Sequence, residues 1–164
     1  MLAAPLPDNE SDRLQALRDL LILDTPPEQR FDRIAAFAAS EFGVPIVLVS
    51  LVDSHRQWIK SRVGTDLCET ERDVSFCGHA ILKPQLFVVE DAWQDARFAD
   101  NPLVTGPPHV RFYAGSPLSA PDGQRVGTLC LIDTRPRGLD AVDRAILDTL
   151  RALVESELAP GAQT

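Results

Sequence analysis

The chain has 164 residues, of which 45% are hydrophobic and 24% are charged, and its formal net charge is −8. This composition is that of one ordinary folded domain and excludes a largely disordered chain. The negative charge and the absence of any run of Lys and Arg argue against nucleic-acid binding. The longest apolar run, residues 44–52, is far shorter than the roughly 20 residues of a membrane-spanning helix.

The N-terminus and the cysteines indicate the compartment. Residues 1–9 have no basic stretch followed by a long apolar one, so they do not resemble a secretory signal. The three cysteines are widely spaced and contain no Cys-x-x-Cys pair, which favours a reduced, cytoplasmic environment. We expect residues 1–9 and 159–164 to be flexible ends of a single domain that covers residues 10–158.

Two helices are predicted in the first quarter of the chain. The first covers about residues 10–22, with an apolar stripe of Leu14, Leu17, Leu20 and Leu21. The second opens at residues 25–28, where a capping-box pattern is combined with proline in the first turn. Gly43 is placed to end it, and its apolar face comprises Phe31, Ile34, Ala35, Ala38 and Phe42.

The middle of the chain predicts strands and irregular segments. Residues 45–52 form a nearly continuous apolar run, typical of a strand that is covered on both faces. A second strand is expected through residues 57–60, and the polar residues 64–73 read as a loop. Ser75 then has the character of an N-cap for a short helix, and residues 86–89 are predicted as a short strand.

The last third predicts a hairpin and a long helix. Residues 101–108 contain three prolines and a glycine and are expected to form a loop. Strands follow at residues 111–118 and 126–132, and a terminal helix covers about residues 139–158. Its predicted apolar stripe is Val142, Ile146, Leu150, Leu153 and Val154. Two hairpins, a lone strand and helices near both ends indicate an α+β domain with a mixed or antiparallel sheet.

One short segment combines a hydroxyl, a thiol and an imidazole, on Ser75, Cys77 and His79. Residues two apart in a helix point to nearly opposite sides. Cys77 and His79 would therefore not share a metal ion or act as a nucleophile and its base. A pair of Ser75 and His79 is geometrically feasible, but a serine at this place more often caps the helix. We predict no metal site and no catalytic residue.

Several longer motifs occur in a fixed order along the chain. They are residues 22–28 (ILDTPPE), 75–81 (SFCGHAI), 101–108 (NPLVTGPP), 111–115 (RFYAG) and 127–133 (GTLCLID). Together they resemble a GAF domain, a small-molecule sensor module related to PAS domains, and in particular a bacterial subgroup of the family. The resemblance covers about residues 10–158, which is nearly the whole chain.

The resemblance implies a central antiparallel sheet of five or six strands. Helices from the N- and C-terminal ends would pack on one face, and a ligand-type pocket would lie on the other, roofed by residues 64–110. The terminal helices would join two copies in a homodimer. Because the chain ends soon after the last predicted helix, we expect a stand-alone domain that signals through the dimer or to another protein, such as a kinase or cyclase.

The candidate ligand-binding residues combine aromatic walls with a few polar groups, as small-molecule sites do; they are Trp58, Ser75, Phe76, His79, Arg111 and Tyr113. His79 is expected to face the pocket and Cys77 to pack in the core. Trp58 and Phe76 could equally be core residues. Arg111 could instead pair with Asp91 or Asp133, because a buried charge needs a partner.

The sequence therefore predicts a non-catalytic sensory domain that binds an unidentified small molecule or a signalling partner. Its cofactor, if any, is unknown. Neither the cysteine context of bilin-binding GAF domains nor the signature of cyclic-nucleotide GAF domains is present. Two alternatives stay open. One is a redox enzyme like the GAF-type free methionine-(R)-sulfoxide reductases, since the chain has three cysteines. The other is an interaction module without a ligand.

Overall fold

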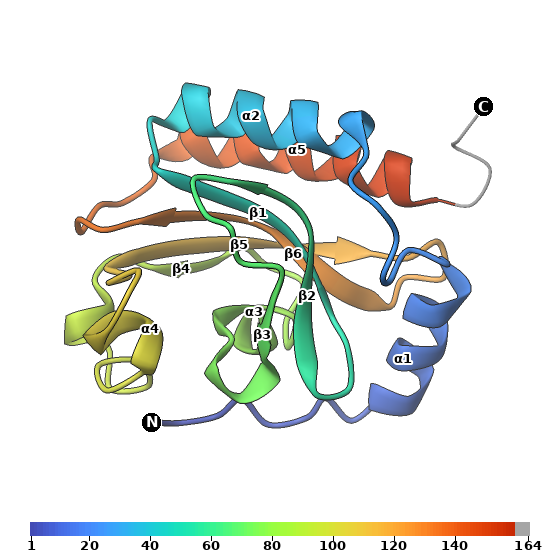
Figure 1. The fold of residues 1–164 in the computed structure, drawn as a ribbon, viewed down its shortest axis with the longest axis horizontal. Helices are drawn as coiled ribbons and strands as arrows, with labels where there is room; N and C mark the ends of the chain where they lie inside the picture. Colours follow the sequence, from blue (N-terminus) through green and yellow to red (C-terminus); the bar gives the residue numbers. More distant parts are fainter. Residues whose placement is uncertain (160–164) are drawn as a thin grey trace.

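The computed structural model describes residues 1–159, and these residues fold around a six-stranded antiparallel sheet (Figure 1). The strand order is β3-β2-β1-β6-β5-β4. The strands are β1 (Ile46–Val52), β2 (Arg56–Val63), β3 (Glu69–Glu71), β4 (Phe87–Val89), β5 (Phe112–Ser119) and β6 (Arg125–Asp133). The helices are α1 (Glu10–Asp19), α2 (Gln29–Phe42), α3 (Phe76–Ala80), α4 (Pro102–Thr105) and α5 (Ala141–Leu158), with single 3₁₀ turns at η1 (Arg72–Val74) and η2 (Ala92–Gln94). This confirms the α+β class and the antiparallel sheet.

Strand β1 lies next to β6 at the centre of the sheet, and its whole length is buried. It pairs with β2 on one side and with β6 on the other. Its alternate residues supply two separate cores. Val47, Val49 and Leu51 belong to the core under α2 and α5, whereas Ile46 and Leu48 belong to the core on the opposite face. Apolar residues on both sides of the strand explain its continuous apolar run.

Helices α2 and α5 lie side by side over one face of the sheet (Figure 1). They bury one stripe each, comprising Phe31, Ala35, Ala38 and Phe42 from α2 and Leu147, Leu150, Val154 and Leu158 from α5. Gly43 ends α2 with a φ of 61°, the left-handed conformation that glycine adopts readily. The predicted face of α2 is confirmed except for Ile34, which is only half-buried.

The predicted stripes of the other two long helices are partly wrong. In α5, Val142 is 66% exposed and Leu153 50% exposed, because the helix turns Leu147 and Leu158 toward the sheet instead. Helix α1 ends at Asp19, earlier than predicted, so Leu21 lies beyond it with a φ of 53° and is 82% exposed. The residue that takes an inner position in α1 is Arg13, which the apolar pattern did not indicate.

The predicted capping box before α2 does not form. The N-cap is Glu28, and its side chain makes no capping bond. The Thr25 hydroxyl instead donates to the carbonyl of Ile22 and accepts from the ammonium of Lys60 at 2.7 Å. That ammonium also pairs with Glu28 at 2.7 Å. The side chains of Thr25 and Glu28 therefore bind the ammonium group of the buried Lys60 and do not cap the helix.

Two predicted loops contain short regular elements. Residues 64–73 include β3, which pairs with the start of β2 and covers the edge of the sheet. Residues 101–108 include α4, a single turn with Pro102 in its first position and Asn101 as its cap. The expectation of a loop rests on the prolines, but proline is compatible with the first turn of a helix, as at Pro102.

The face of the sheet opposite α2 and α5 is covered by η1, α3, α4 and the segments between them (Figure 1). Residues 1–9 run beneath α3 toward α1 in an irregular path. The carbonyl of Leu2 lies 3.1 Å from Nε2 of His79. Of the predicted flexible C-terminus, residues 160–164 lie outside the described part of the chain. Within residues 1–159, no helix is both long and apolar enough to cross a membrane.

Candidate functional site

A cavity of about 40 Å³ lies between the sheet and the segments that cover this face. Its floor consists of Ile46, Leu48, Gln57, Ile59, Tyr113 and Ile132, and its roof of Thr65, Leu67, Thr70, Phe76, Cys77, Leu103, Pro108 and Val110. The roof thus comes from residues 64–110, the segment that the family resemblance implied. One water needs roughly 10–15 Å³ of such space, so the cavity has room for about three water-sized molecules.

The polar centre of this cavity is the thiol of Cys77. Its Sγ lies 3.0 Å from the hydroxyl of Tyr113 and 3.0 Å from Oγ1 of Thr128. Cys130 and Ser50 lie near enough to affect its pKa. Cys77 and Cys130 are 1% and 0% exposed, and both belong to the core on this face of the sheet. Two hydroxyl groups in contact with one sulfur, in an otherwise apolar core, form a specific environment for that thiol.

These contacts decide the protonation of the group. Burial raises the pKa of Cys77, but hydrogen bonds from Cys130, Thr128, Tyr113 and Ser50 outweigh it and lower the pKa to about 7. Burial raises the pKa of Cys130 well above its ordinary value, and the hydrogen bond to Cys77 adds to this effect. Burial and the two neighbouring thiols likewise raise the pKa of Tyr113. Of these three groups, Cys77 is therefore the one that loses its proton most readily.

A line of polar side chains connects this centre to the roof. The amide Nε2 of Gln57 donates to the hydroxyl of Ser50 at 2.8 Å. The hydroxyl of the half-buried Thr70, on the edge strand β3, donates to Oε1 of the same glutamine at 3.4 Å. Gln57 and Thr70 both line the cavity. Polar groups thus run along the sheet from Cys77 to the outer strand.

Helix α3 is held in place by its cap and by aromatic stacking. The Ser75 hydroxyl accepts from the backbone N–H of Gly78 at 3.2 Å, which confirms the predicted N-cap. The ring of Phe76 stacks on Phe98, with centroids 4.1 Å apart, and lies 5.1 Å from the ring of Tyr113. These contacts fix the short helix so that Cys77, the next residue, points at the sheet.

Asn101 joins the two covering helices. Its Oδ1 accepts from the backbone N–H of Leu103 and so caps α4, while its Nδ2 donates to the carbonyl of Val74 at 3.0 Å, just before α3. The side chain is 2% exposed. One buried amide therefore fixes both parts of the roof relative to each other.

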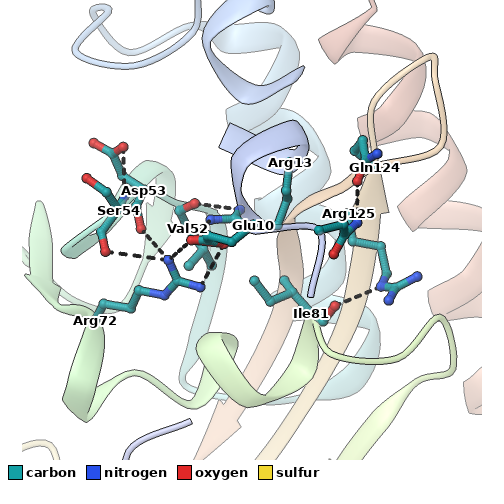
Figure 2. A network of polar contacts seen from close by, with 10 residues as sticks. Glu10, Arg13, Val52, Asp53, Ser54, Arg72, Ile81, Gln124 and Arg125 are labelled. Carbon is teal, nitrogen blue, oxygen red and sulfur yellow. Dashed lines mark hydrogen bonds and ion pairs between the residues drawn. The ribbon is translucent and has the colours of Figure 1, made fainter. Parts of the chain in front are cut away.

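A polar network attaches this roof to the N-terminal helix, as Figure 2 shows. Glu10 accepts hydrogen bonds from both Arg13 and Arg72. Arg13 also donates to the carbonyl of Val52 at 2.7 Å, and Arg72 to that of Asp53 at 3.1 Å. One carboxylate thus pairs with two buried guanidinium groups, and the network joins α1, the β1–β2 turn and η1.

The far end of α3 has its own anchor. The guanidinium of Arg125 donates to the carbonyls of Ile81 and Leu82 at 2.7 and 3.1 Å. Figure 2 shows Arg125 beside Gln124, whose side chain accepts from Asn9 ahead of α1. Helix α3 therefore has an arginine near each end. Arg72 bonds to Glu10 of α1, and Arg125 follows Gln124, which bonds to Asn9.

The structure brings only part of the predicted ligand set together. Phe76 and Tyr113 line the cavity, and Ser75 supports it as the helix cap. Trp58 lies on the opposite face: it pairs with Leu51 in the sheet, and both belong to the core under α2 and α5. Arg111 forms a bidentate pair with Asp91 at 2.7 and 2.9 Å and does not line the cavity.

Cys77 packs in the core, as expected, and it also lines the cavity. His79 lines a separate hollow of about 170 Å³ that also contains Lys83, Phe87 and Arg97. Burial lowers the pKa of His79, opposed by its contact with the Leu2 carbonyl. Helix α3 therefore turns Cys77 toward the cavity at the sheet and His79 away from it. A ligand-binding role for His79 stays a prediction.

Sequence reasoning missed Gln57, Thr128 and Cys130. The period of two in β6 offered a signal, because Thr128, Cys130 and Ile132 share one face of a strand. Within residues 1–159, no three His, Cys, Asp or Glu side chains come together in a way that could hold a metal ion.

Comparisons with known proteins agree with this architecture. A model of the family described as "GAF domain" matches residues 26–158. Over 159 residues the chain is 42% identical to a cyclic di-GMP phosphodiesterase of Pseudomonas aeruginosa; the match covers 96% of the chain but 27% of that protein. The chain therefore spans about a quarter of this curated relative.

Solved structures share the fold at low sequence identity. The free methionine-R-sulfoxide reductase of Neisseria meningitidis is 20% identical, with a TM-score of 0.65, over 96% of this chain and 95% of that one. The GAF domain of an Acinetobacter phosphoenolpyruvate-protein phosphotransferase is 16% identical, with a TM-score of 0.62, over 90% and 92% of the two chains. At these identities the likeness shows the fold alone.

Proposed function

The chain belongs to the GAF domain family, and we propose that it is a regulatory domain that binds a small molecule in the cavity beside Cys77 and Tyr113. The observation that carries the proposal is the cavity itself. Its walls are almost entirely apolar, and its few polar groups converge on one point. Small-molecule sites have this combination, because apolar walls provide affinity and a few polar groups provide orientation.

The size of the cavity limits what binds without rearrangement. About 40 Å³ holds only a very small molecule. A larger ligand requires the roof to move. Only Phe76, Cys77 and Val110 are buried among the roof residues, whereas the outer roof residues are half-buried or exposed, namely Thr65, Leu67, Thr70, Leu103 and Pro108. We propose that ligand entry displaces this part of the roof, and that the networks around Arg72 and Asn101 carry the displacement to α1.

We propose that the output of the domain is cyclic di-GMP signalling. The support is the 42% identity, over almost the whole chain, to one part of a cyclic di-GMP phosphodiesterase. We assign the enzymatic activity to the protein that this domain regulates, and not to the domain itself. The regulated partner is then an enzyme that breaks down or makes this nucleotide, which narrows the kinase or cyclase expected from the sequence.

We also propose a homodimer through the outer surface of α2 and α5. Three large apolar side chains are exposed there, Phe37 at 53%, Val142 at 66% and Leu153 at 50%. Exposed apolar groups on adjacent helices favour helix pairing between copies. In such a dimer, a displacement of α1 and of the sheet in one subunit would be transmitted to the second subunit through the paired helices.

Thermal denaturation tests the ligand proposal. Reduced protein is heated with each of a panel of small metabolites, with cyclic di-GMP included. At one hundred times its dissociation constant a ligand adds about 2.7 kcal/mol of stability, so its melting temperature should rise by roughly 5–10 °C.

Two matched variants locate the binding site. Leu103→Phe places a ring in the roof of the cavity, and Leu21→Phe makes the same change at an exposed position. The shift should persist in Leu21→Phe and disappear in Leu103→Phe. An equal shift in both variants would place the ligand elsewhere. A panel without any hit, together with a dimer in solution, would favour the interaction module.

A second candidate function is reduction of free methionine sulfoxide. The observation in its favour is a low-pKa thiol, Cys77, that lines a cavity and has a second buried thiol near it. The reductase reading requires turnover of the sulfoxide with stoichiometric oxidation of the thiols. Protein that leaves the sulfoxide unchanged while its thiols remain titratable would exclude this enzyme and keep the sensor.

A further inference from the structure

Cys77 and Cys130 are two buried thiols of the same core, and ligand binding does not require the pair. Sγ of Cys77 lies 3.0 Å from Oγ1 of Thr128, which is two residues before Cys130 and on the same face of β6. Cys77 comes from the covering helix α3, and Cys130 from the centre of the sheet. The third cysteine, Cys68, lies in the loop before β3 and is exposed. The chain therefore has two thiols that can reach each other and one that is separate from them, and the latter serves as an internal reference.

The surroundings of the pair differ between its two members. Cys77 has hydroxyl groups of Tyr113 and Thr128 at 3.0 Å, which can donate to a thiolate. For Cys130, burial and the neighbouring Cys77 raise the pKa by more than Thr128 and the backbone of Leu48 lower it, so this thiol keeps its proton. One sulfur is therefore prepared as a nucleophile, and the other holds a proton that it can give up later.

Access to Cys77 is limited by size. The thiol lines the 40 Å³ cavity but is only 1% exposed. This space admits molecules of the size of a few waters. A bulky alkylating reagent does not fit without movement of the roof, whereas hydrogen peroxide, which is little larger than water, does.

We propose that Cys77 is a site of oxidation by small hydroperoxides, and that Cys130 then closes a disulfide with it. The Cys77 thiolate attacks one peroxide oxygen; the O–O bond breaks, the other oxygen leaves as hydroxide and takes a proton, and the sulfur becomes a sulfenic acid. The sulfur of Cys130 then attacks this sulfur. The S–O bond breaks, an S–S bond forms, and the proton of Cys130 leaves with the hydroxyl as water. In total two thiols and one peroxide give one disulfide and two waters.

The disulfide would join α3 covalently to β6. The roof helix is otherwise held by hydrogen bonds and by stacking. Oxidation would therefore lock the roof over the sheet and fill the centre of the cavity. This goes beyond the small-molecule function proposed above and does not depend on it, because the oxidant is consumed and no ligand needs to bind.

Mass spectrometry of the peroxide-treated chain tests the proposal. Reduced protein is treated with hydrogen peroxide, unfolded, alkylated and digested. We expect a cross-linked peptide pair that contains Cys77 and Cys130, with Cys68 free of it. The Cys68→Ser variant should give the same cross-link at the same rate. In Cys130→Ser the sulfenic acid on Cys77 should persist as one added oxygen, and in Cys77→Ser no cross-link should form.

Rates distinguish a prepared thiol from accidental damage. Tyr113→Phe removes one donor and should slow the oxidation of Cys77 roughly five- to tenfold, while the oxidation of Cys68 stays unchanged. In the native wild type, a bulky maleimide should label Cys68 and leave Cys77 unlabelled. The proposal is overturned if peroxide oxidises Cys68 while Cys77 and Cys130 both remain alkylatable, or if Tyr113→Phe leaves the rate unchanged.

The two proposals fail in different experiments. The ligand shift is measured in reduced protein, where no disulfide is present. The cross-link is measured without any metabolite. A ligand shift without a cross-link would keep the sensor and remove the oxidation site, and the opposite pair of results would do the reverse.

Discussion

The hydroxyl of Tyr113 lies 3.0 Å from Sγ of Cys77, at the point where strand β5 faces the covering helix α3. Both residues are 1% exposed. The contact places a polar interaction in an apolar core, where hydrogen bonds are strong and the loss of one partner is costly. It is also one of the contacts that lower the pKa of the thiol.

Replacement of this hydroxyl should raise the pKa of Cys77. The thiol has a pKa of about 7, lowered by several hydrogen bonds against the effect of burial. Tyr113→Phe removes one of them, worth roughly 1–1.5 kcal/mol, and should raise the pKa by about one unit. Thiolate absorbance against pH, in a Cys68→Ser background, measures the change. A midpoint that does not move would show that Tyr113 does not donate to the thiolate.

The roof should depend on Asn101. Asn101→Ala removes the cap of α4 and the bond to the Val74 carbonyl, so it should lower the free energy of unfolding by about 2 kcal/mol. Urea denaturation measures this value. The matched control is Asn9→Ala, an exposed amide that bonds to a side chain, which should cost less than about 0.5 kcal/mol. Equal losses would contradict the role of Asn101 in the roof.

How much of this arrangement the sequence could reveal differs between elements. The strand cores were predictable, because long apolar runs such as that of β1 are specific for a buried strand. Ser75 and Gly43 were predictable too, since their capping roles are local. The rotation of α3 was not, because a helix of five residues is too short for its apolar period to define a face.

Buried charges explain the other differences. Arg13 and Lys60 are 1% and 2% exposed, yet charged residues are normally read as surface. Each has a partner far away in sequence: Arg13 bonds to the carbonyl of Val52 as well as to the nearby Glu10, and Lys60 bonds to the segment before α2. Such pairings depend on the fold and cannot be recognised from the local sequence. The motif at residues 25–28 therefore resembles a helix cap, whereas in the structure its polar groups bind the buried Lys60.

Glu10 should be essential for the network around α1. Glu10→Gln leaves the buried guanidinium groups of Arg13 and Arg72 without a countercharge, and should cost about 2–3 kcal/mol of unfolding free energy. Asp12→Asn is the control, because Asp12 is also acidic and in the first turn of α1 but is exposed. If both variants lose the same stability, the effect comes from the helix dipole and not from the network.

The same residue should make stability depend on pH. Burial raises the pKa of Glu10, but hydrogen bonds from Arg13 and Arg72 outweigh it and hold the pKa below its usual value of 4.5. The stabilisation is then fully present above pH 4.5 and is lost as the pH falls through the lower pKa of the folded state. Urea denaturation between neutral and acidic pH should show wild type approaching Glu10→Gln in acid. A constant difference would contradict this pairing.

The proposed dimer makes a prediction for the outer helix surface. Leu153 is 50% exposed on α5, so Leu153→Glu should not disturb the fold but should place a charge in the interface. We expect the dissociation constant of the dimer to rise at least tenfold, measured by analytical ultracentrifugation. Arg144→Glu changes an exposed residue on the same helix and is the control for charge. A wild-type chain that is monomeric at all concentrations would reject the dimer.

Gly127 should tolerate a side chain less than any helix-terminal glycine. A Cβ at this position would lie 1.9 Å from the carbonyl oxygen of Ser50, on the neighbouring central strand. Backbone atoms of a buried strand cannot move aside cheaply, so Gly127→Ala should cost about 4 kcal/mol or more. At Gly43 a Cβ would meet nothing within 4 Å, and only its φ of 61° is unfavourable, so Gly43→Ala should cost about 1–2 kcal/mol. Urea denaturation of both variants compares a steric clash with a conformational cost. Equal losses would mean that β1 and β6 can separate at this point, next to Thr128 and the Cys77 site.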